Sequence, residues 1–485
     1  MKNCAVWKNT QINNTEITEL YGGSVIFQYS PIMYRIIAVN LPLAPRLRGR
    51  FFEKRKNNLS FASPLNSLSN MDIFRYLLCL IFSDRSMYMQ RKTGVFEGGF
   101  CKNTVYRFLN NTKTNWQRFT TLLSARIINE FMKPLTSEDR KDVFIIDDSL
   151  FDRSRSSKTE LLAKVFDHCS MKYKRGYRML TLGWSDGNSF IPVNHCLLSA
   201  ADDKNLLCEA SVYDGRSLAG KRRKQSRRKA TEVMLELIQT AQKAGLTAKY
   251  VLFDSWFSSP RAVVALKQEH GLETIAMVKK SSKIKYGYED GRFNIKEIYS
   301  KNRKRRGRSK YLLSVNVTIG DEAIPAKIVC VRNKSKKKDW LAILSTDTSL
   351  SEEEIIRIYG KRWDIEVFFK SCKSYLRLVK ECRSTSYDAL NAHTAIVFTR
   401  YMMLSVAQRR NTDDKTLCEL FFCLMDELDD ITFSQSMRII IDALMDSVVE
   451  FFHITEQELE TFTASFIQRL PKYMQDALEY GQSAA

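Results

Sequence analysis

The sequence has little histidine, proline or glycine: 5, 9 and 19 residues, respectively, in a chain of 485. So few glycines and prolines exclude a collagen-like or low-complexity chain, and a hydrophobic share of 44% is typical of ordinary folded domains. The 11 cysteines include no Cys-x2-Cys pair, so neither a zinc finger nor a disulfide framework is predicted. Because histidine is so scarce, metal-dependent chemistry would have to rely on carboxylate ligands.

Acidic residues and long apolar runs are also lacking. The 54 Asp and Glu residues are outnumbered by 76 Lys and Arg residues, which gives a net charge of +22. The most apolar stretches, 74–82 and 394–407, each contain an arginine and fall short of the ~20 residues that span a bilayer. Residues 1–20 are polar and lack the apolar segment of a secretory signal. We therefore expect a cytoplasmic, nucleoid-associated protein with no membrane partner.

The positive charge is unevenly distributed. Residues 411–485 hold 4 basic and 15 acidic residues, a net charge of −11, whereas residues 1–410 carry +33. A large basic body is typical of proteins that bind polyanions, nucleic acids above all. The acidic end predicts a separate helical region that either mediates dimerisation or masks the basic body.

Short apolar strands alternate with helical patterns in the middle of the chain. Buried strands are predicted at 143–146, 249–253 and 274–278, and a hairpin at 178–198. This order predicts an α/β fold. The patterns divide the chain into five regions: a mainly helical DNA-binding region at 1–138, the first part of an α/β core at 139–278, a β-rich basic insert at 279–349, the second part of the core at 350–410 and an acidic helical dimerisation region at 411–485. In the first region, 102–109 fits either the second helix of a helix-turn-helix, with Lys102 and Arg107 facing phosphate, or a packed helix with no special role.

Four polar residues are predicted to share one narrow stripe of a helix that begins at Ser351. They are Tyr359, Arg362, Glu366 and Lys373. At ~100° per residue, their directions differ by no more than about 60°. Such a stripe is either a solvated face with ion pairs or a site where Glu366 binds a metal beside cations that guide a phosphate backbone.

Two aspartate positions follow apolar strands. Asp147 or Asp148 comes after the first predicted strand, and Asp254 after the second. Residues that follow parallel strands converge at the carboxyl edge of an α/β sheet. Together with Glu366, these acids would offer three hard oxygen ligands, which suit Mg²⁺ or Mn²⁺. Two such ions ~4 Å apart can hold the attacking and leaving oxygens of an in-line displacement at phosphorus.

The same residues resemble the motifs of a known family, the insertion-sequence 4 family of DDE transposases. The Tyr-Arg-Glu-Lys signature of that family resembles Tyr359-x2-Arg362-x3-Glu366-x6-Lys373. Residues 253–257 (Phe-Asp-Ser-Trp-Phe) resemble its second-acid strand, and residues 145–149 (Ile-Ile-Asp-Asp-Ser) its first, where the acid directly precedes Ser or Thr. By this resemblance the first acid is Asp148, with Asp147 as the alternative.

The resemblance implies a ribonuclease-H-like catalytic core with the basic insert between the second and third acids, flanked by helical regions at both ends. Asp148, Asp254 and Glu366 would be the catalytic residues and the ligands of two Mg²⁺ ions, which Mn²⁺ can replace. The implied activity is cut-and-paste transposition of an insertion sequence, by cleavage at the transposon ends, possibly through hairpin ends, and strand transfer into target DNA. The implied partners are double-stranded DNA, as terminal inverted repeats and target, and a second copy of the chain in a synaptic homodimer.

Further residues are expected to contact DNA. The resemblance implies that Tyr359, Arg362 and Lys373 hold phosphates near the cut. Trp340 resembles the insert tryptophan that stacks on a flipped base, and packing in the core of the insert itself is the equal alternative. Two basic runs would bind phosphates of the transposon end without selecting a sequence: Lys221, Arg222, Arg223, Arg227 and Arg228 in the first, and Arg303, Arg305 and Arg306 in the second.

Two other functions stay open at this point. A ribonuclease-H-like, metal-dependent DNA nuclease without transposition would use the same acids but would not join pre-cut ends. A non-catalytic DNA-binding relic of a transposase would show no metal-dependent nicking. The presence of all three acids favours an enzyme.

Overall fold

The computed structural model describes most of the chain between residues 70 and 410 and one helix near the C-terminal end. The described residues are 70–82, 86–93, 96, 100–136, 140–167, 170–305, 309–333, 339–410 and 456–469. The predictions for residues 1–69 and for most of the acidic region lie outside the described residues. Within the acidic region, the structure describes helix α16 (Glu456–Gln468).

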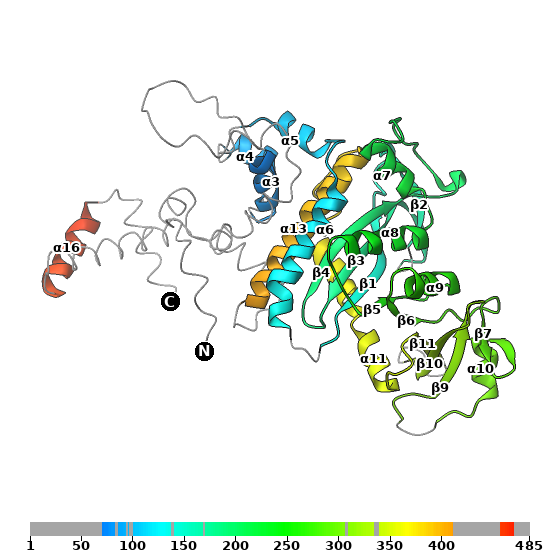
Figure 1. The fold of residues 1–485 in the computed structure, drawn as a ribbon. Coiled ribbons are helices and arrows are strands. Elements are labelled where there is room, and N and C mark those ends of the chain that lie inside the picture. The colour runs from blue at the N-terminus through cyan, green and yellow to red at the C-terminus, as the bar shows by residue number, and fades with distance from the viewer. Residues whose placement is uncertain are drawn as a thin grey trace, which may run out of the picture.

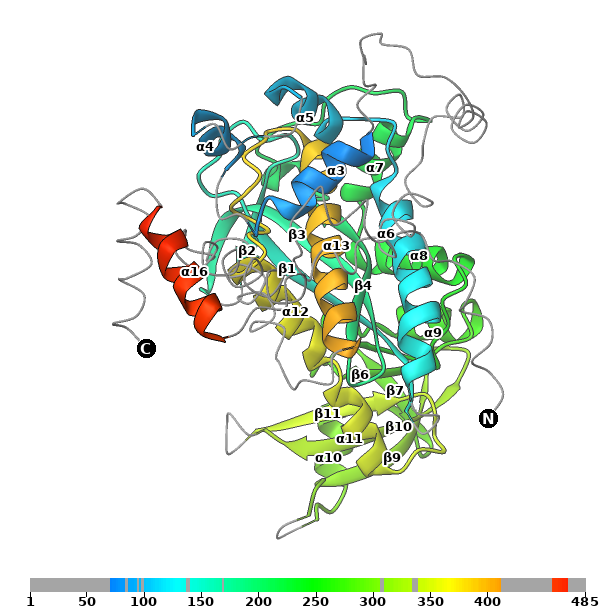
Figure 2. The same ribbon diagram turned by 90° about the vertical axis from the view of Figure 1, so that its left-hand side faces the viewer.

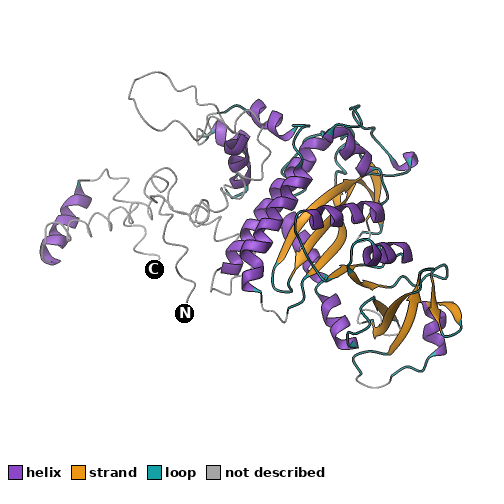
Figure 3. Cartoon of the chain, viewed as in Figure 1, coloured by secondary structure: helices purple, strands orange, loops and turns teal. Residues whose placement is uncertain are grey.

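A mixed β-sheet forms the centre of the fold (Figures 1 and 3). Its core strands are β1 (Val143–Asp152), β3 (Lys172–Ser185), β4 (Phe190–Leu198), β5 (Tyr250–Phe253) and β6 (Glu273–Met277). They lie in the order β4-β3-β1-β5-β6, in which β3 is antiparallel to β4 and β1, and β5 and β6 are parallel to β1. The short strand β2 (Ala163–Asp167) pairs with the beginning of β3.

The hairpin between β3 and β4 forms around residues 185–188, as predicted. Gly187 has a φ of 88°, in the left-handed region that glycine enters without strain. The side chain of Asp186 accepts hydrogen bonds from the backbone N–H groups of Asn188 and Ser189. Local turn chemistry therefore fixes this connection, and with it the register of two core strands.

The basic insert continues the core sheet. It contains β7 (Lys285–Tyr288), β8 (Gly291–Asn294), α10 (Ile295–Lys301), β9 (Leu313–Ile319), β10 (Ile324–Arg332) and β11 (Trp340–Ser345). Strand β11 pairs antiparallel with β6, with Leu344 opposite Ala276. This pairing makes the core and the insert one 11-stranded sheet. The boundaries drawn from the sequence between the five regions stay predictions.

Helices cover both faces of the core strands. They are α6 (Trp116–Ile127), α7 (Leu218–Ser226), α8 (Ala230–Lys243), α9 (Pro260–Gln268), α11 (Glu352–Gly360), α12 (Trp363–Ser374) and α13 (Tyr387–Arg410), with a π-helical turn at Ile128–Met132 and 3-10 turns at Lys133–Leu135 and Asp203–Asn205. Helices α6 and α13 lie on one side of the strands and α8 and α9 on the other (Figure 1). Helix α12 contacts β1, β4 and α13.

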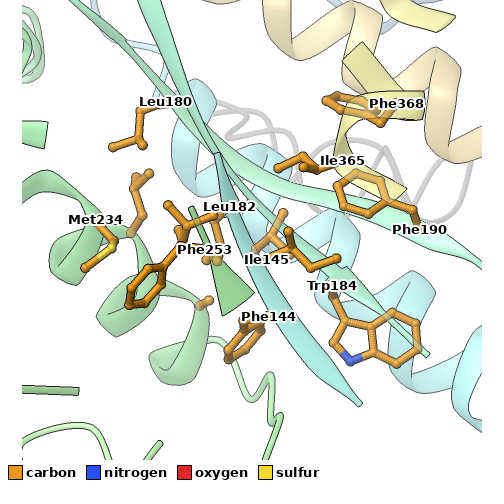
Figure 4. Close-up of a cluster of buried hydrophobic side chains, with 14 of the residues drawn as sticks. Phe144, Ile145, Leu180, Leu182, Trp184, Phe190, Met234, Phe253, Ile365 and Phe368 are labelled. Atoms are coloured by element: carbon orange, nitrogen blue, oxygen red, sulfur yellow. The ribbon is translucent and has the colours of Figure 1, made fainter. Parts of the chain in front are cut away.

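Buried side chains on opposite faces of β1 pack against different helices (Figure 4). One group consists of Phe144, Leu180, Leu182 and Phe253 with Met234 of α8. The other consists of Ile145 and Phe190 with Ile365 and Phe368 of α12. Successive residues of a strand point to opposite faces of the sheet. Alternate residues of β1 therefore pack against α8 on one face and α12 on the other.

Three short helices lie at one end of α13 (Figure 2). They are α3 (Asn70–Cys79), α4 (Met87–Lys92) and α5 (Lys102–Leu109). Arg400 of α13 is fully buried; it donates to the carbonyl oxygens of Leu77 and Leu78 in α3, and it forms an ion pair with Glu381 at 2.5 Å. The predicted helix at 102–109 is confirmed, and the role of α5 in a helix-turn-helix stays a prediction.

Two elements differ from the sequence prediction. Strand β1 does not end at its two aspartates but continues to Asp152, because β3 still pairs with it where β5 has ended. The helix predicted to begin at Ser351 is two helices, α11 and α12, which meet at Lys361 and Arg362. The predicted start at Ser351 is confirmed, and Ser351 forms a capping box there with Glu354.

The predicted α/β fold class is confirmed. The mixed sheet, with its antiparallel β3–β4 hairpin, its parallel strands β1, β5 and β6 and its helices on both faces, is consistent with a ribonuclease-H-like core. None of the described helices is long and apolar enough to cross a membrane.

Candidate active site

Asp147 and Asp254 lie side by side on neighbouring parallel strands. The pairing of β1 with β5 ends at Ile146 opposite Phe253, and each aspartate is the next residue along its strand. Paired residues of parallel strands have their side chains on the same face, so Ile146 and Phe253 share one face. The next residue of each strand, Asp147 or Asp254, then faces the opposite side. The negative charge of Asp254 accordingly raises the pKa of Asp147.

Asp148, which the family resemblance favoured as the first acid, lies on the opposite face of β1. Its carboxylate forms an ion pair with Arg178 of β3. The guanidinium of Arg178 also lies over the ring of Trp256, 4.9 Å from the ring centroid. The structure therefore places Asp147, the alternative, and not Asp148, on the side of the helix that carries Glu366.

Arg362 joins Asp147 to Glu366. Its Nη1 donates to Oδ2 of Asp147 at 3.1 Å, and its Nη2 donates to Oε1 of Glu366 at 2.6 Å. Arg362 occupies the cap position of α12, and Glu366 lies in the first turn of that helix rather than in its middle. The positive end of the helix dipole favours an ionised carboxylate at such a position.

The environment of Asp147 disfavours its negative charge. Burial raises the pKa of Asp147 to about 7, and the charges of Asp148 and Asp254 act in the same direction. The guanidinium of Arg362 opposes this rise but does not cancel it. Strongly perturbed acids of this kind cluster at functional sites, because a further cation would relieve them.

The other two residues of the predicted stripe face the same place. Burial raises the pKa of Tyr359, in the last turn of α11, and the charges of Asp254 and Asp147 add to the rise. Lys373 donates from Nζ to Oγ of Ser149 at 2.6 Å, and Ser149 lies two residues beyond Asp147 on the same face of β1. The stripe therefore converges on the two aspartates even though its helix is broken.

Hydrophobic packing fixes the orientation of α12. Ile365 and Phe368 are fully buried, and the ring centroid of Phe368 lies 5.1 Å from that of Phe190. Ser185 donates from its hydroxyl to Asp364 at 2.6 Å and ties the start of the helix to β3. Figure 4 shows Ile365 and Phe368 of α12 beside Phe190. Burial of this side of α12 leaves the polar stripe on another side of the helix, where Arg362 contacts Asp147.

A preformed metal site is not present among the described residues. There, no group of three or more acidic, histidine or cysteine side chains is arranged to hold an ion. The donor set still fits a hard divalent cation, because Asp147, Asp254 and Glu366 bring carboxylate oxygens to one face, where burial and then the charges of neighbouring acids raise the pKa of Asp147. Arg362 lies between two of these carboxylates and is the group that an ion would displace.

Trp340 packs within the insert. Its ring stacks on Tyr299 of α10, with 4.1 Å between the centroids and 12° between the planes. The ammonium group of Lys280 lies 4.1 Å from the centroid of Trp340. This is the packing alternative considered from the sequence, and contact with a DNA base stays a prediction.

The first basic run is partly structural. Arg223 is 5% exposed and forms ion pairs with Glu160 at 2.6 Å and with Asp388 at 2.8 Å. Arg222 also forms an ion pair with Asp388 and donates to the carbonyl oxygen of Thr114. Acids distant in the sequence hold both guanidinium groups, which disfavours DNA contact by Arg222 and Arg223, and that contact stays a prediction.

The other basic residues remain candidates for DNA contact. Arg227 and Arg228 form ion pairs with acidic neighbours, which reduces the charge that they offer to a phosphate. Among these candidates the exposed residues are Lys221, Arg228, Arg303 and Arg305. Arg306 lies outside the described residues. DNA contact by any of these residues stays a prediction.

The sequence analysis missed the pairing of Asp148 with Arg178, and no local signal points to it. A signal for Asp147 was present, however. Four apolar residues precede Asp147 in β1, and four precede Asp254 in β5. Strands of equal length that pair in register bring the first acid after each run together.

Comparison with protein families supports this site. Residues 78–340, more than half of the chain, match the family described as DDE superfamily endonuclease. The match includes β1 and β5 with their aspartates and ends before α11 and α12, so Glu366 lies beyond it. A comparison with curated protein sequences found no match. Endonucleases of this superfamily generally use divalent metal ions. With its two adjoining strand aspartates and the extent of this match, the chain belongs to the DDE superfamily endonuclease family.

Proposed function

We propose that the protein is a DNA transposase of the insertion-sequence 4 family, which cleaves transposon ends and joins them to target DNA. One observation carries the proposal: Arg362 holds Asp147 and Glu366 together on the face where Asp254 also lies. Membership of the DDE superfamily endonuclease family supports a transposase-like nuclease. The Tyr-Arg-Glu-Lys spacing supports the narrower family.

In this proposal Asp147, Asp254 and Glu366 hold the divalent ions, and Asp147 takes the role that the sequence resemblance gave to Asp148. Bound Mg²⁺, or Mn²⁺ in its place, would supply Lewis-acid activation of the attacking and leaving oxygens. Arg362, once displaced from the carboxylates, can hold a phosphate oxygen through its planar guanidinium. Lys373, beside Ser149 on the same face, adds a second cation for the DNA backbone.

The proposed partners are double-stranded DNA, as terminal inverted repeats and target, and a second copy of the chain in a synaptic homodimer. The net charge of +33 over residues 1–410 supports the nucleic-acid partner. The acidic residues 411–485 would mediate contacts between the two copies.

The cleavage test compares Asp254→Asn and Glu366→Gln with the wild type on DNA that carries the inverted repeats bracketing the coding region. Each variant should bind the duplex as the wild type does and cleave it in Mg²⁺ at least ~10³-fold more slowly, because a metal-bound carboxylate supplies several kcal/mol to the transition state. The control is Glu353→Gln, an exposed residue of α11 that pairs with Lys310 at 2.7 Å, which should cleave normally. Cleavage at the wild-type rate in both site variants would overturn the proposal.

Strand transfer separates the proposal from its main alternative, a ribonuclease-H-like nuclease without transposition. Pre-cut ends with free 3′-hydroxyl groups are incubated with a supercoiled target in Mg²⁺. A transposase gives joined products, and the same gel shows whether cleavage passes through hairpin ends. Metal-dependent cleavage with no joined product would identify the nuclease instead.

A further inference from the structure

A second feature of the surface lies away from the candidate acids. A cleft of about 1390 Å³ separates the helices α3, α4 and α5 from the beginning of α13 and from the segment 375–386, which leads from α12 to α13. In Figure 2 this segment runs between α12 and the end of α13 that lies beside α4 and α5. One wall of the cleft is α5, which the sequence analysis placed in a DNA-binding region, whereas the opposite wall, at 377–385, carries no DNA contact expected from the sequence.

The lining of the cleft is strongly basic. Seven cations line it: Arg91, Lys92 and Lys102 on one side, Arg377, Lys380 and Arg383 on the other, and the buried Arg400. Among the described lining residues the acid is Glu381, and Arg400 already binds it through hydrogen bonds of 2.5 and 3.0 Å. The described lining therefore carries a net positive charge, which suits a polyanion.

Aromatic rings accompany these cations. Tyr88 and Tyr106 line the cleft and are 64% and 47% exposed. The ammonium of Lys92 lies 5.9 Å from the ring centroid of Tyr88, and that of Lys102 lies 5.3 Å from the centroid of Tyr106. Exposed rings next to ammonium groups suit a ligand that has both phosphates and flat apolar surfaces. A nucleic acid has both, whereas an acidic protein segment lacks the regular phosphates.

The cleft is also connected to the candidate active site. Helix α12 carries Glu366 in its first turn and Lys373 in its last, and Arg377 of the cleft follows three residues after the helix ends. The positive surface therefore continues from the end of α12 into the cleft. A DNA strand bound in the cleft would run along α12 toward Asp147, Asp254 and Glu366.

We propose that this cleft binds the phosphate backbone of the duplex DNA that flanks the cleavage point. The inference deepens the proposed function, and it rests on that function for the identity of the substrate. The contacts are to the backbone, so they increase affinity for every DNA sequence and position the duplex without selecting its sequence.

The test is a double charge reversal, Lys102→Glu with Arg383→Glu, which changes one cation on each side of the cleft. Binding of a fluorescent duplex is measured by anisotropy in EDTA over a series of salt concentrations. The variant should bind at least ~10-fold more weakly at 0.1 M salt, and the slope of log affinity against log salt should fall by about 2, because two phosphate contacts are lost. The matched control is Lys243→Glu with Arg261→Glu, two exposed residues of α8 and α9 with the same change in net charge.

Binding by the cleft variant equal to that of the control would overturn the inference. So would unchanged DNA affinity together with a changed sedimentation coefficient, which would show that the cleft contacts an acidic protein surface. Thermal melting shows whether the double charge reversal impairs folding. If it does, the double variant Lys102→Ala with Arg383→Ala must show the same decrease in the slope of log affinity against log salt. Because no metal is present, these results do not depend on whether Asp254 and Glu366 catalyse cleavage.

Discussion

Arg223 and Arg362 are each held between two carboxylates, and the two arrangements differ in how the protein environment shifts the pKa of the paired acid. Arg223 binds Glu160 and Asp388 in the interior, and Arg362 binds Asp147 and Glu366 at the candidate site. At the first, burial alone would raise the pKa of Glu160, but hydrogen bonds from Arg223 and from two backbone N–H groups outweigh burial and lower it. At the second, burial prevails and the pKa of Asp147 rises to about 7.

The difference separates a structural network from a functional one. Glu160 is satisfied by its neighbours, so a further cation there would gain nothing. Asp147 is not satisfied by Arg362 alone, so its surroundings favour a second positive charge. The direction of the pKa shift, raised at Asp147 and lowered at Glu160, therefore distinguishes these two clusters, although each contains an ion pair.

The largest expected effect comes from replacing one acid in each cluster. Asp147→Asn should reduce Mg²⁺-dependent cleavage by ~10³-fold or more while the protein stays folded, because a metal ligand is lost. Glu160→Gln should lower stability and leave the cleavage rate per folded molecule within a few-fold of the wild type. Asp148→Asn is the control on the opposite face of β1 and should keep cleavage within ~10-fold. Greater loss in Asp148→Asn than in Asp147→Asn would reverse the assignment of the first acid.

Removing each arginine should affect stability unequally. Arg223→Met leaves two buried carboxylates without their cation, and the free energy of unfolding should fall by about 3–5 kcal/mol. Arg362→Met should cost no more than about 2 kcal/mol, because Asp147 can take up a proton near neutral pH and Glu366 has access to water. Urea denaturation at pH 7 measures both values. Equal losses would show that the two clusters serve the same purpose.

The smallest effect is the pH dependence of the Glu160 contribution. The folded protein holds this pKa below its ordinary value of 4.5, so the unfolded chain binds more protons in that range and stability rises with pH. The stability difference between the wild type and Glu160→Gln should be complete well above pH 4.5 and should shrink as the pH falls through the folded pKa. A difference that stays constant down to pH 3 would mean that the ionised carboxylate contributes nothing.

Much of the fold could be predicted from local sequence. The apolar runs gave the buried strands, the Ser-Asp-Gly-Asn pattern gave the hairpin, and Ser351 with Glu354 gave the start of α11. Each depends on residues close together in the chain. The break between α11 and α12 had one local sign, Gly360, which the continuing periodicity outweighed.

The sequence analysis did not identify features of the site that depend on contacts between residues far apart in the chain. Which of Asp147 and Asp148 faces α12 depends on the pairing of β1 with β5, which lies about 100 residues away in the chain. Arg223 looked like a DNA contact because its run is basic, but its partners Glu160 and Asp388 are 63 and 165 residues away. The four residues of the polar stripe do face the acids, but they lie on two helices, α11 and α12, and not on the single helix predicted.

The pairing of β11 with β6 has a mechanical consequence. Through it, the basic insert is bonded laterally to the strand next to β5, and the chain then passes from Ser345 into α11 within seven residues. In the proposed function, DNA bound to the insert would shift its strands. Such a shift would reach Arg362 by two routes, through the paired strands β11, β6 and β5 and along the chain from β11 through α11. The insert is thus part of the same sheet as the core strands and is not a separate domain on a flexible linker. A change in its orientation would therefore also move the strands that carry the acids.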